Sequence, residues 1–156
     1  MKHELLISID PAGSKDDIFA WWIDGRLTNI TSDFPACVDE WAIVIEDQFG
    51  AHKGDQLLKL AKHAGWLVGR MGRNLDDVTW SKPAVWKPAL CKRSSPKVRK
   101  CDDYFVHRAN LKTLNDTETD VYMTAISMTN NQGTKMDIAD AVGIGLVALD
   151  RIHAVL

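Results

Sequence analysis

Two short apolar segments of the sequence end in a carboxylate. Leu5–Asp10 and Trp41–Glu46 have the nearly continuous apolar composition of strands that are buried on both faces. A carboxylate in such a place is costly to bury unless it is paired or bound to a metal ion, and ligands collect at strand ends in α/β proteins. For Asp10 alone, a turn through Pro11 would be the simpler explanation. Glu46 repeats the arrangement, and two acids near the C-terminus strengthen it.

Those two acids, Asp137 and Asp140, are three residues apart. On a helix, residues at this spacing face the same way about 5 to 6 Å apart, so two carboxylates would lie side by side and repel each other. Acids in the first turn of a helix also occur as caps and as partners of the helix dipole, which is the alternative explanation. A pair beside a mostly apolar helix, in a chain with two strand-end acids, favours a divalent-metal site formed by all four carboxylates.

Positive charge is concentrated in one segment, although the net charge of the chain is only -2. Seven basic residues precede the next acid, Asp102, and Arg108 and Lys112 extend the run. These seven residues are Lys82, Lys87, Lys92, Arg93, Lys97, Arg99 and Lys100. A solvated helix face followed by a loop is the alternative. Trp80 and Trp86 lie among the charges and could stack or pack, and we therefore expect the segment to contact nucleic-acid phosphates.

The remaining patterns supply the elements that must position these residues. Asp24-Gly25 between two β-branched runs predicts a hairpin, and Asn115 predicts a helix cap. We expect strands over about 5–10, 17–23, 26–31, 41–46 and 78–80, and helices over about 32–39, 55–73, 83–92, 118–128 and 137–154. Strands interleaved with helices indicate an α/β fold, and the antiparallel hairpin makes its five-stranded sheet mixed.

Length and composition place further bounds on the protein. Its 156 residues, 46% of them apolar, suit a single domain over 1–156. There is no long apolar run and no signal-peptide pattern at the start, so we expect a cytoplasmic protein without a membrane partner. The three cysteines form no paired motif, and we expect them to be reduced.

The helix expected over 55–73 carries small residues at every fourth position. They are Ala61, Gly65 and Gly69. Small side chains let a helix approach its neighbour closely. Tight packing of this stripe on the sheet is the first interpretation, and a dimer contact is the second.

Four segments resemble, in order, the signatures of the RuvC family of Holliday junction resolvases. The segments are Ile7-Ser8-Ile9-Asp10-Pro11, Val44-Ile45-Glu46-Asp47-Gln48-Phe49, Leu58-Lys59-Leu60-Ala61-Lys62-His63-Ala64-Gly65 and Asp137-Ile138-Ala139-Asp140-Ala141-Val142. The size and the Trp86-Lys87 region are more similar to the compact phage or mobile-element branch. Ala12 departs from the family pattern, which usually has glycine there, and the basic segment does not align with the family lysines.

The resemblance implies an RNase H-like fold, a homodimer, and magnesium-dependent, symmetrical nicking of four-way DNA junctions. It implies two Mg²⁺ ions, for which Mn²⁺ would substitute, and no small-molecule cofactor. Asp10 would bridge the ions, Glu46 and Asp140 would flank them, and Asp137 would complete one coordination shell. Phe49 would lie near the junction centre and contact unstacked bases; burial under the following helix is the alternative. Asp47 should point away from the site because alternate strand residues face opposite sides.

Two other functions agree with the same residues. Another RNase H-like nuclease, such as a YqgF-like enzyme acting on structured RNA or a transposase-like domain, would use the same acids on a different substrate. A non-catalytic protein that binds DNA junctions would need the basic segment but not the carboxylates. Metal-dependent cleavage separates the second function from the others.

Overall fold

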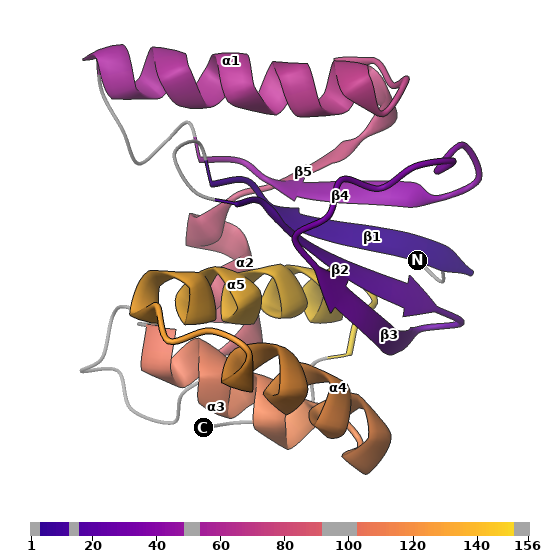
Figure 1. Ribbon diagram of the computed structural model, residues 1–156, viewed down its shortest axis with the longest axis vertical. Coiled ribbons are helices and arrows are strands. Elements are labelled where there is room, and N and C mark those ends of the chain that lie inside the picture. Colours follow the sequence, from indigo (N-terminus) through magenta and orange to yellow (C-terminus); the bar gives the residue numbers. More distant parts are fainter. Residues whose placement is uncertain (1–3, 13–15, 49–53, 92–102, 152–156) are drawn as a thin grey trace.

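The structure, a computed structural model, describes residues 4–12, 16–48, 54–91 and 103–151. Its elements occur in an order of four strands, one helix, one strand and four helices (Figure 1). They are β1 (Leu5–Asp10), β2 (Ile18–Ile23), β3 (Arg26–Thr31), β4 (Ala42–Glu46), α1 (Gly54–Arg70), a 3-10 turn (Leu75–Asp77), β5 (Thr79–Ser81), α2 (Pro83–Leu90), α3 (Asp103–Thr113), α4 (Asp116–Ser127) and α5 (Gln132–Ala148).

The five strands form one mixed sheet in the order β3-β2-β1-β4-β5. The pairs β1–β2 and β2–β3 are antiparallel, whereas β1–β4 and β4–β5 are parallel. Asp24 and Gly25 both have positive φ, at 50° and 75°, as the tight turn of the predicted hairpin requires. This strand order and the flanking helices give an RNase H-like topology, so the predicted fold class is confirmed.

Each face of the sheet has its own apolar core. Among the described helices, α1 covers one face, where it packs on Ile7, Ile9 and Ile45, and α5 covers the other together with α2, α3 and α4 (Figure 1). Alternate residues of β1 therefore face α1 and α5, and the strand is buried on both sides. By the same alternation, Asp10 projects toward α5, which sets the position of the acidic site.

Helix α5 lies unusually close to the sheet because its sequence contains glycines at the contact. A Cβ built on Gly145 would be 2.4 Å from ring atoms of Trp22, and one on Gly143 would be 2.8 Å from Trp86. Neither space admits a methyl group. Hydrogen bonds fix the same contact, since Trp22 Nε1 donates to Ser8 Oγ at 2.9 Å and Ser8 Oγ donates to the carbonyl of Ala141 at 2.7 Å.

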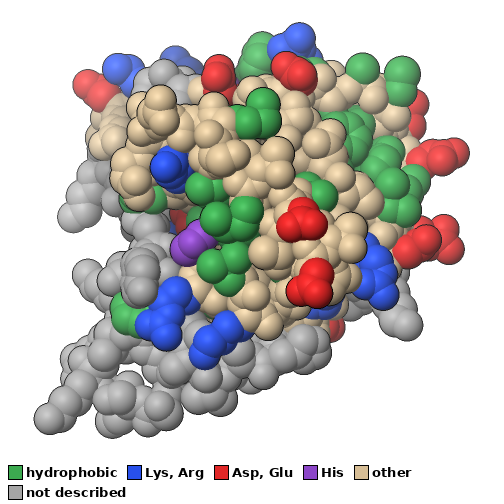
Figure 2. All heavy atoms as spheres, turned by 60° about the horizontal axis from the view of Figure 1, so that its bottom comes forward, with side chains coloured by type: hydrophobic (Ala, Val, Ile, Leu, Met, Phe, Trp, Pro, Cys, Tyr) green, Lys and Arg blue, Asp and Glu red, His purple; other side chains and the backbone are tan. Residues whose placement is uncertain are grey.

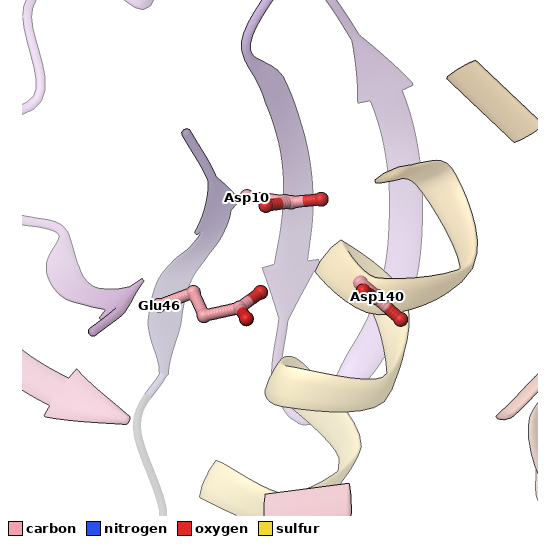
Figure 3. Close-up of side chains that lie close together, drawn as sticks. All are labelled: Asp10, Glu46 and Asp140. Atoms are coloured by element: carbon pink, nitrogen blue, oxygen red, sulfur yellow. The ribbon is translucent and has the colours of Figure 1, made fainter. Parts of the chain in front are cut away.

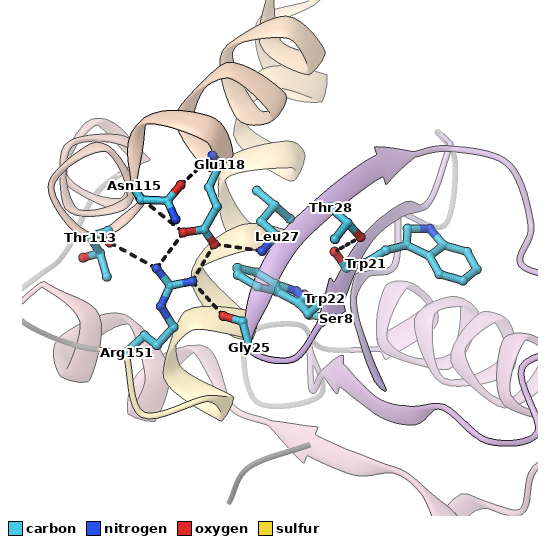
Figure 4. A network of polar contacts seen from close by, with 10 residues as sticks. All are labelled: Ser8, Trp21, Trp22, Gly25, Leu27, Thr28, Thr113, Asn115, Glu118 and Arg151. Carbon is cyan, nitrogen blue, oxygen red and sulfur yellow. Dashed lines mark hydrogen bonds and ion pairs between the residues drawn. The ribbon is translucent and has the colours of Figure 1, made fainter. Parts of the chain in front are cut away.

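A partly buried ion pair joins α4 to the chain after α5 (Figure 4). The guanidinium of Arg151 donates to both carboxylate oxygens of Glu118, at 2.5 and 2.8 Å, and to the carbonyl of Gly25 at 2.9 Å. Burial disfavours ionisation of Glu118, but hydrogen bonds from Arg151 and from the backbone of Leu27 and Asn115 outweigh it and lower the pKa of the carboxyl. This network holds the hairpin against the C-terminal helices.

The predicted helix over 32–39 is wrong, because the chain there forms turns without a helix. Cys37 has a φ of 57°, which a right-handed helix does not allow. The guanidinium of Arg73 donates to the carbonyls of Val38, Asp39 and Trp41 at 2.7 to 2.8 Å. These carbonyls are satisfied by a residue more than thirty positions away, at separations of 32 to 35 residues. Tertiary contacts therefore override the local cap signals.

Two other expectations need correction. α5 begins at Gln132, five residues earlier than predicted, because the side chain of Asn131 caps it by accepting from the backbone N–H of Thr134. Cys37 is a free thiol, but Cys91 is in a disulfide, contrary to the expectation of reduced cysteines. Pairing depends on the distance between thiols in the fold, which sequence spacing did not show.

The small-residue stripe of α1 does not pack tightly on the sheet. A Cβ on Gly65 or Gly69 would meet nothing within 4 Å. The residues of α1 that contact the sheet are instead Ala64, Leu67 and Val68. Within the described residues, none of the helices has the length and apolar character needed to cross a lipid bilayer.

Candidate metal centre

The ends of two neighbouring parallel strands bring the first two carboxylates together. Ile9 of β1 pairs with Ile45 of β4, so Asp10 and Glu46, the next residues, lie at the same level of the sheet. Both strands end here, and both side chains project to the α5 side. The parallel register therefore converts two acids separated by 36 positions of sequence into neighbours.

Helix α5 adds the third carboxylate. One oxygen each of Asp10, Glu46 and Asp140 lies within 4.8 Å of the others, and the three side chains come from β1, β4 and α5 (Figure 3). Asp137 lies one helical turn before Asp140, and it is close enough to Asp10 to raise the pKa of that carboxyl. Both helix acids are in the interior of α5, well after its start at Gln132, which excludes the explanation of acids in a first helical turn.

The crowding of negative charge raises the pKa of the buried carboxyls. Burial, followed by the charges of Glu46, Asp140 and Asp137, raises the pKa of Asp10 well above its usual value of 3.8. Burial and Asp140 raise the pKa of Glu46 from 4.5 to about 7, against an opposing effect of Lys87. Without a cation, the protein keeps these groups ionised only at a cost in free energy.

Lys87 of α2 approaches the site from the edge. Its ammonium Nζ is 3.3 Å from Oδ2 of Asp140, with only 21% of the Lys87 side chain exposed. One residue of the predicted phosphate-binding segment thus contacts a carboxylate of the acidic site. A single lysine cannot neutralise several carboxylates, so an excess of negative charge remains.

The chemistry of the donor set fits a divalent cation. The site offers carboxylate oxygens only, which hard cations such as Mg²⁺ prefer. Oε2 of Glu46 is buried and has no hydrogen-bond donor among the residues that the structure describes. Because an unsatisfied buried carboxylate oxygen is costly, a metal ion is the partner that this arrangement best accommodates.

Two groups outside the predicted set position the loop after β1. Gln48 Nε2 donates to Oδ1 of Asp10 at 3.3 Å and to the carbonyl of Pro11 at 2.8 Å. On the other side, the carboxylate of Asp17 accepts from the backbone N–H of Ala12 at 2.8 Å. The sequence held a signal for Gln48, since it follows Glu46 by two residues and alternation keeps it on the same side of an extended chain.

The carbonyls of the two residues that flank Asp140 accept hydrogen bonds from side chains of other elements. Asn110 Nδ2 of α3 donates to the carbonyl of Ala139 at 2.9 Å, and Ser8 Oγ donates to that of Ala141 at 2.7 Å. Ser8 precedes Asp10 by two residues and so faces the same side of β1. No sequence pattern pointed to Asn110, because its contact depends on how α3 packs against α5.

The other predicted contact residues are only partly within the described chain. Lys82 is exposed. Phe49, Lys92, Arg93, Lys97, Arg99 and Lys100 lie outside the described residues. On the face shown in Figure 2, the Lys and Arg side chains that are coloured stand among apolar and acidic ones. Asp47 is not in the group of three carboxylates within metal-binding reach among the described residues.

Comparison of the chain with protein-family models and with curated proteins finds no match. What the chain shows is therefore an RNase H-like fold with a buried acidic triad of Asp10, Glu46 and Asp140, an arrangement suggestive of a metal-dependent nuclease site.

Proposed function

We propose that this protein is a metal-dependent endonuclease that resolves four-way DNA junctions by paired symmetrical nicks. The observation that carries the proposal is the acidic triad, which joins the ends of two parallel strands of an RNase H-like sheet to a helix on its α5 face. The choice of a four-way junction as substrate is supported by the resemblance of four ordered segments to the RuvC family.

The carboxylates would hold two Mg²⁺ ions, with Mn²⁺ as a substitute. When bound, these ions would activate water and stabilise the leaving oxygen in phosphodiester hydrolysis. By resemblance to the RuvC family, Asp10 would serve both ions, and its side chain has Glu46, Asp140 and Asp137 as neighbours. Glu46 and Asp140 would flank it, and Asp137 would complete one shell.

The protein's own groups would align the substrate at this centre. Lys87 lies at the rim of the acidic site and would contact a phosphate that enters it. Gln48 restrains both the side chain of Asp10 and the loop through Pro11, so Asp10 keeps one orientation without substrate. The basic residues from Lys82 to Lys100 would bind the arms of the junction through their phosphates.

A homodimer is part of the proposal. Two nicks related by the two-fold symmetry of a junction require two active sites related by the same symmetry, and a symmetric dimer supplies them. We expect sedimentation to show a dimer with junction DNA.

The decisive experiment is a cleavage assay on four substrates: four-way DNA, linear DNA duplex, an RNA–DNA hybrid and branched RNA, each with Mg²⁺ and with EDTA. We expect cleavage of four-way DNA only, and only with Mg²⁺. Asp10→Asn should reduce the rate by more than about 100-fold, beyond the loss typical of groups that only support a metal ligand. It should leave junction binding nearly intact, because one negative charge near the phosphates is removed.

Asp33→Asn is the matched control, since it makes the same change at an exposed position. Cleavage of branched RNA or of the hybrid alone would assign the site to another RNase H-like nuclease. Binding of junction DNA without any metal-dependent cleavage would refute a catalytic role.

A further inference from the structure

A row of basic and aromatic side chains follows the exposed side of α1. The row, called here the α1 stripe, consists of Lys59, Lys62, His63, Trp66 and Arg70. Spacings of three and four residues place these side chains along one side of a helix. That side is distinct from the one that packs on the sheet through Ala64, Leu67, Val68 and Met71. α1 lies on the outside of its face of the sheet (Figure 1), and four residues of the stripe are exposed while His63 is partly exposed.

Arg70 is held in place by two aromatic rings. Its guanidinium carbon Cζ lies 4.1 Å from the ring centre of Phe34 and 5.1 Å from that of Trp66. The side chain is exposed and makes no ion pair or hydrogen bond with any residue that the structure describes. Stacking on rings restrains a guanidinium but leaves its N–H groups available, and their planar arrangement matches the oxygens of a phosphate.

Trp66 presents a large aromatic surface beside this cation. It is 52% exposed, and its ring stacks on the imidazole of His63 with centres 5.7 Å apart and an angle of 23°. Phe34 lies on the same side, with its ring centre 6.4 Å from that of Trp66. Aromatic groups interleaved with cations are typical of surfaces that follow a nucleic-acid strand.

The stripe is connected through His63 to the loop that follows β1. Nε2 of His63 lies 2.7 Å from Oδ1 of Asp17, and the same oxygen accepts the backbone N–H of Ala12 at 2.8 Å. Ala12 follows Asp10 by two residues. From Lys59 to Arg70 the helix rises by about 17 Å, which is about the length of five nucleotides of one duplex strand. Because Asp10 itself projects to the α5 side of the sheet and α1 covers the other side, a nucleic acid that occupies both the acidic site and the stripe would pass around the end of β1 at the Ala12 loop.

We propose that the α1 stripe binds the sugar-phosphate backbone of the nucleic-acid substrate outside the metal centre, with Arg70 as its prearranged phosphate ligand. The inference rests on the proposed function only in that nucleic acid is the substrate. The charge of the stripe favours an anionic partner. Lys59, Lys62 and Arg70 are exposed cations with no ion-pair partner among the described residues. A second copy of the chain docking symmetrically would set these cations against the same cations, which is unfavourable.

The test measures binding of a fluorescently labelled four-way DNA junction in EDTA, from about 50 to about 200 mM salt. Arg70→Gln should weaken binding about five- to tenfold at the low end and reduce the slope of log affinity against log salt by about 0.9. Arg26→Gln is the matched control, since Arg26 is exposed at the start of β3, beside the opposite end of β1 from Asp10, and it should leave affinity and slope unchanged. Trp66→Ala should also weaken binding, by about fivefold, although it removes no charge.

Equal behaviour of Arg70→Gln and Arg26→Gln would overturn the proposal. So would sedimentation showing that the protein is a dimer and that Arg70→Gln converts it to monomer, because the stripe would then be a protein interface. If Trp66→Ala does not fold, Lys62→Gln replaces it, with the same expected loss of slope as Arg70→Gln. Cleavage with Mg²⁺ separates this inference from the proposed function. If the wild-type protein cleaves no nucleic acid but Arg70→Gln weakens binding, the stripe is supported and the proposed nuclease function is refuted. If the wild-type protein cleaves junction DNA but Arg70→Gln leaves binding unchanged, the nuclease function is supported and the stripe is refuted.

Discussion

The buried carboxyl of Glu46 should make the stability of the metal-free protein fall between pH 4.5 and about 7. Its pKa in the folded state is raised, so the folded protein binds a proton that the unfolded chain has released. The associated stability is complete below about 4.5 and is lost as the pH rises through about 7. This direction is the opposite of that for a carboxylate in an ordinary ion pair.

The size of the effect follows from the shift. A rise in pKa from 4.5 to about 7 corresponds to about 3 kcal/mol at about 1.4 kcal/mol per pKa unit, most of which appears between about pH 5 and about pH 8. For a chain of this size, that difference lowers the melting temperature by about 5 to 10 °C. The full figure applies because Glu46 is only 6% exposed, so solvent screens its charge little.

Glu46→Gln tests the reasoning in thermal melts at about pH 5 and about pH 8 with EDTA. Between the two pH values the free energy of unfolding of the variant should fall by about 2 to 3 kcal/mol less than that of wild type, because the variant has no carboxyl at position 46 to ionise. The change in stability between the two pH values is compared within each protein, so the constant cost of burying the glutamine amide in the variant cancels. Glu40→Gln, the same change at an exposed position, should behave as wild type.

A bound metal ion should oppose the loss of stability that ionisation of Glu46 causes. With Mg²⁺ at about pH 8, the melting temperature of wild type should rise, because a bound cation stabilises the folded state, and that of Glu46→Gln should rise much less. A wild-type protein whose melting temperature in EDTA does not fall from about pH 5 to about pH 8 would refute the argument. A variant that falls as steeply as wild type would show that Glu46 is not the group responsible.

Two further predictions concern the contacts that support the site. Gly145→Ala should lower the melting temperature, because its Cβ would lie 2.4 Å from the ring of Trp22, whereas Gly65→Ala, with nothing within 4 Å, should raise it through a gain of about 1 kcal/mol in helix propensity. Similar melting temperatures for the two variants would contradict the close approach of α5. Glu118→Gln should cost about 2 to 4 kcal/mol in urea denaturation at neutral pH, since the charge of Arg151 remains without its partner. Because the pKa of Glu118 is lowered, the stability from its ionised form is present above 4.5 and is lost as the pH falls below it, so the difference between variant and wild type should shrink in acid. A difference that persists unchanged at low pH would argue against the ion pair.

The sequence by itself determined the sheet and the acids at its strand ends. Continuous apolar composition predicted β1 and β4 as strands buried on both faces, and it placed Asp10 and Glu46 at their ends to within a residue. Local chemistry also predicted the hairpin at Asp24-Gly25 and the cap at Asn115. These features were predictable because they depend on neighbours in sequence: alternation, positive φ and a side chain bonding three residues ahead.

The tertiary structure alone decided which carboxylates meet and what surrounds them. The register of β1 with β4 brings Asp10 beside Glu46, and the close contact of Gly145 with Trp22 lets α5 deliver Asp140. The position of Lys87 against Asp140, which lowers the pKa of Glu46, likewise depends on how α2 packs.

Two of the errors have the same origin. The turns over 32–39 are held by Arg73 from beyond α1, and the glycines of α1 face away from the sheet rather than into it. In these two cases the deciding partner is far away in sequence, where periodicity and propensity carry no information. A pattern of residues fixes which side of an element is apolar, whereas the partner of that side, and the charges it brings, exist only once the chain has folded.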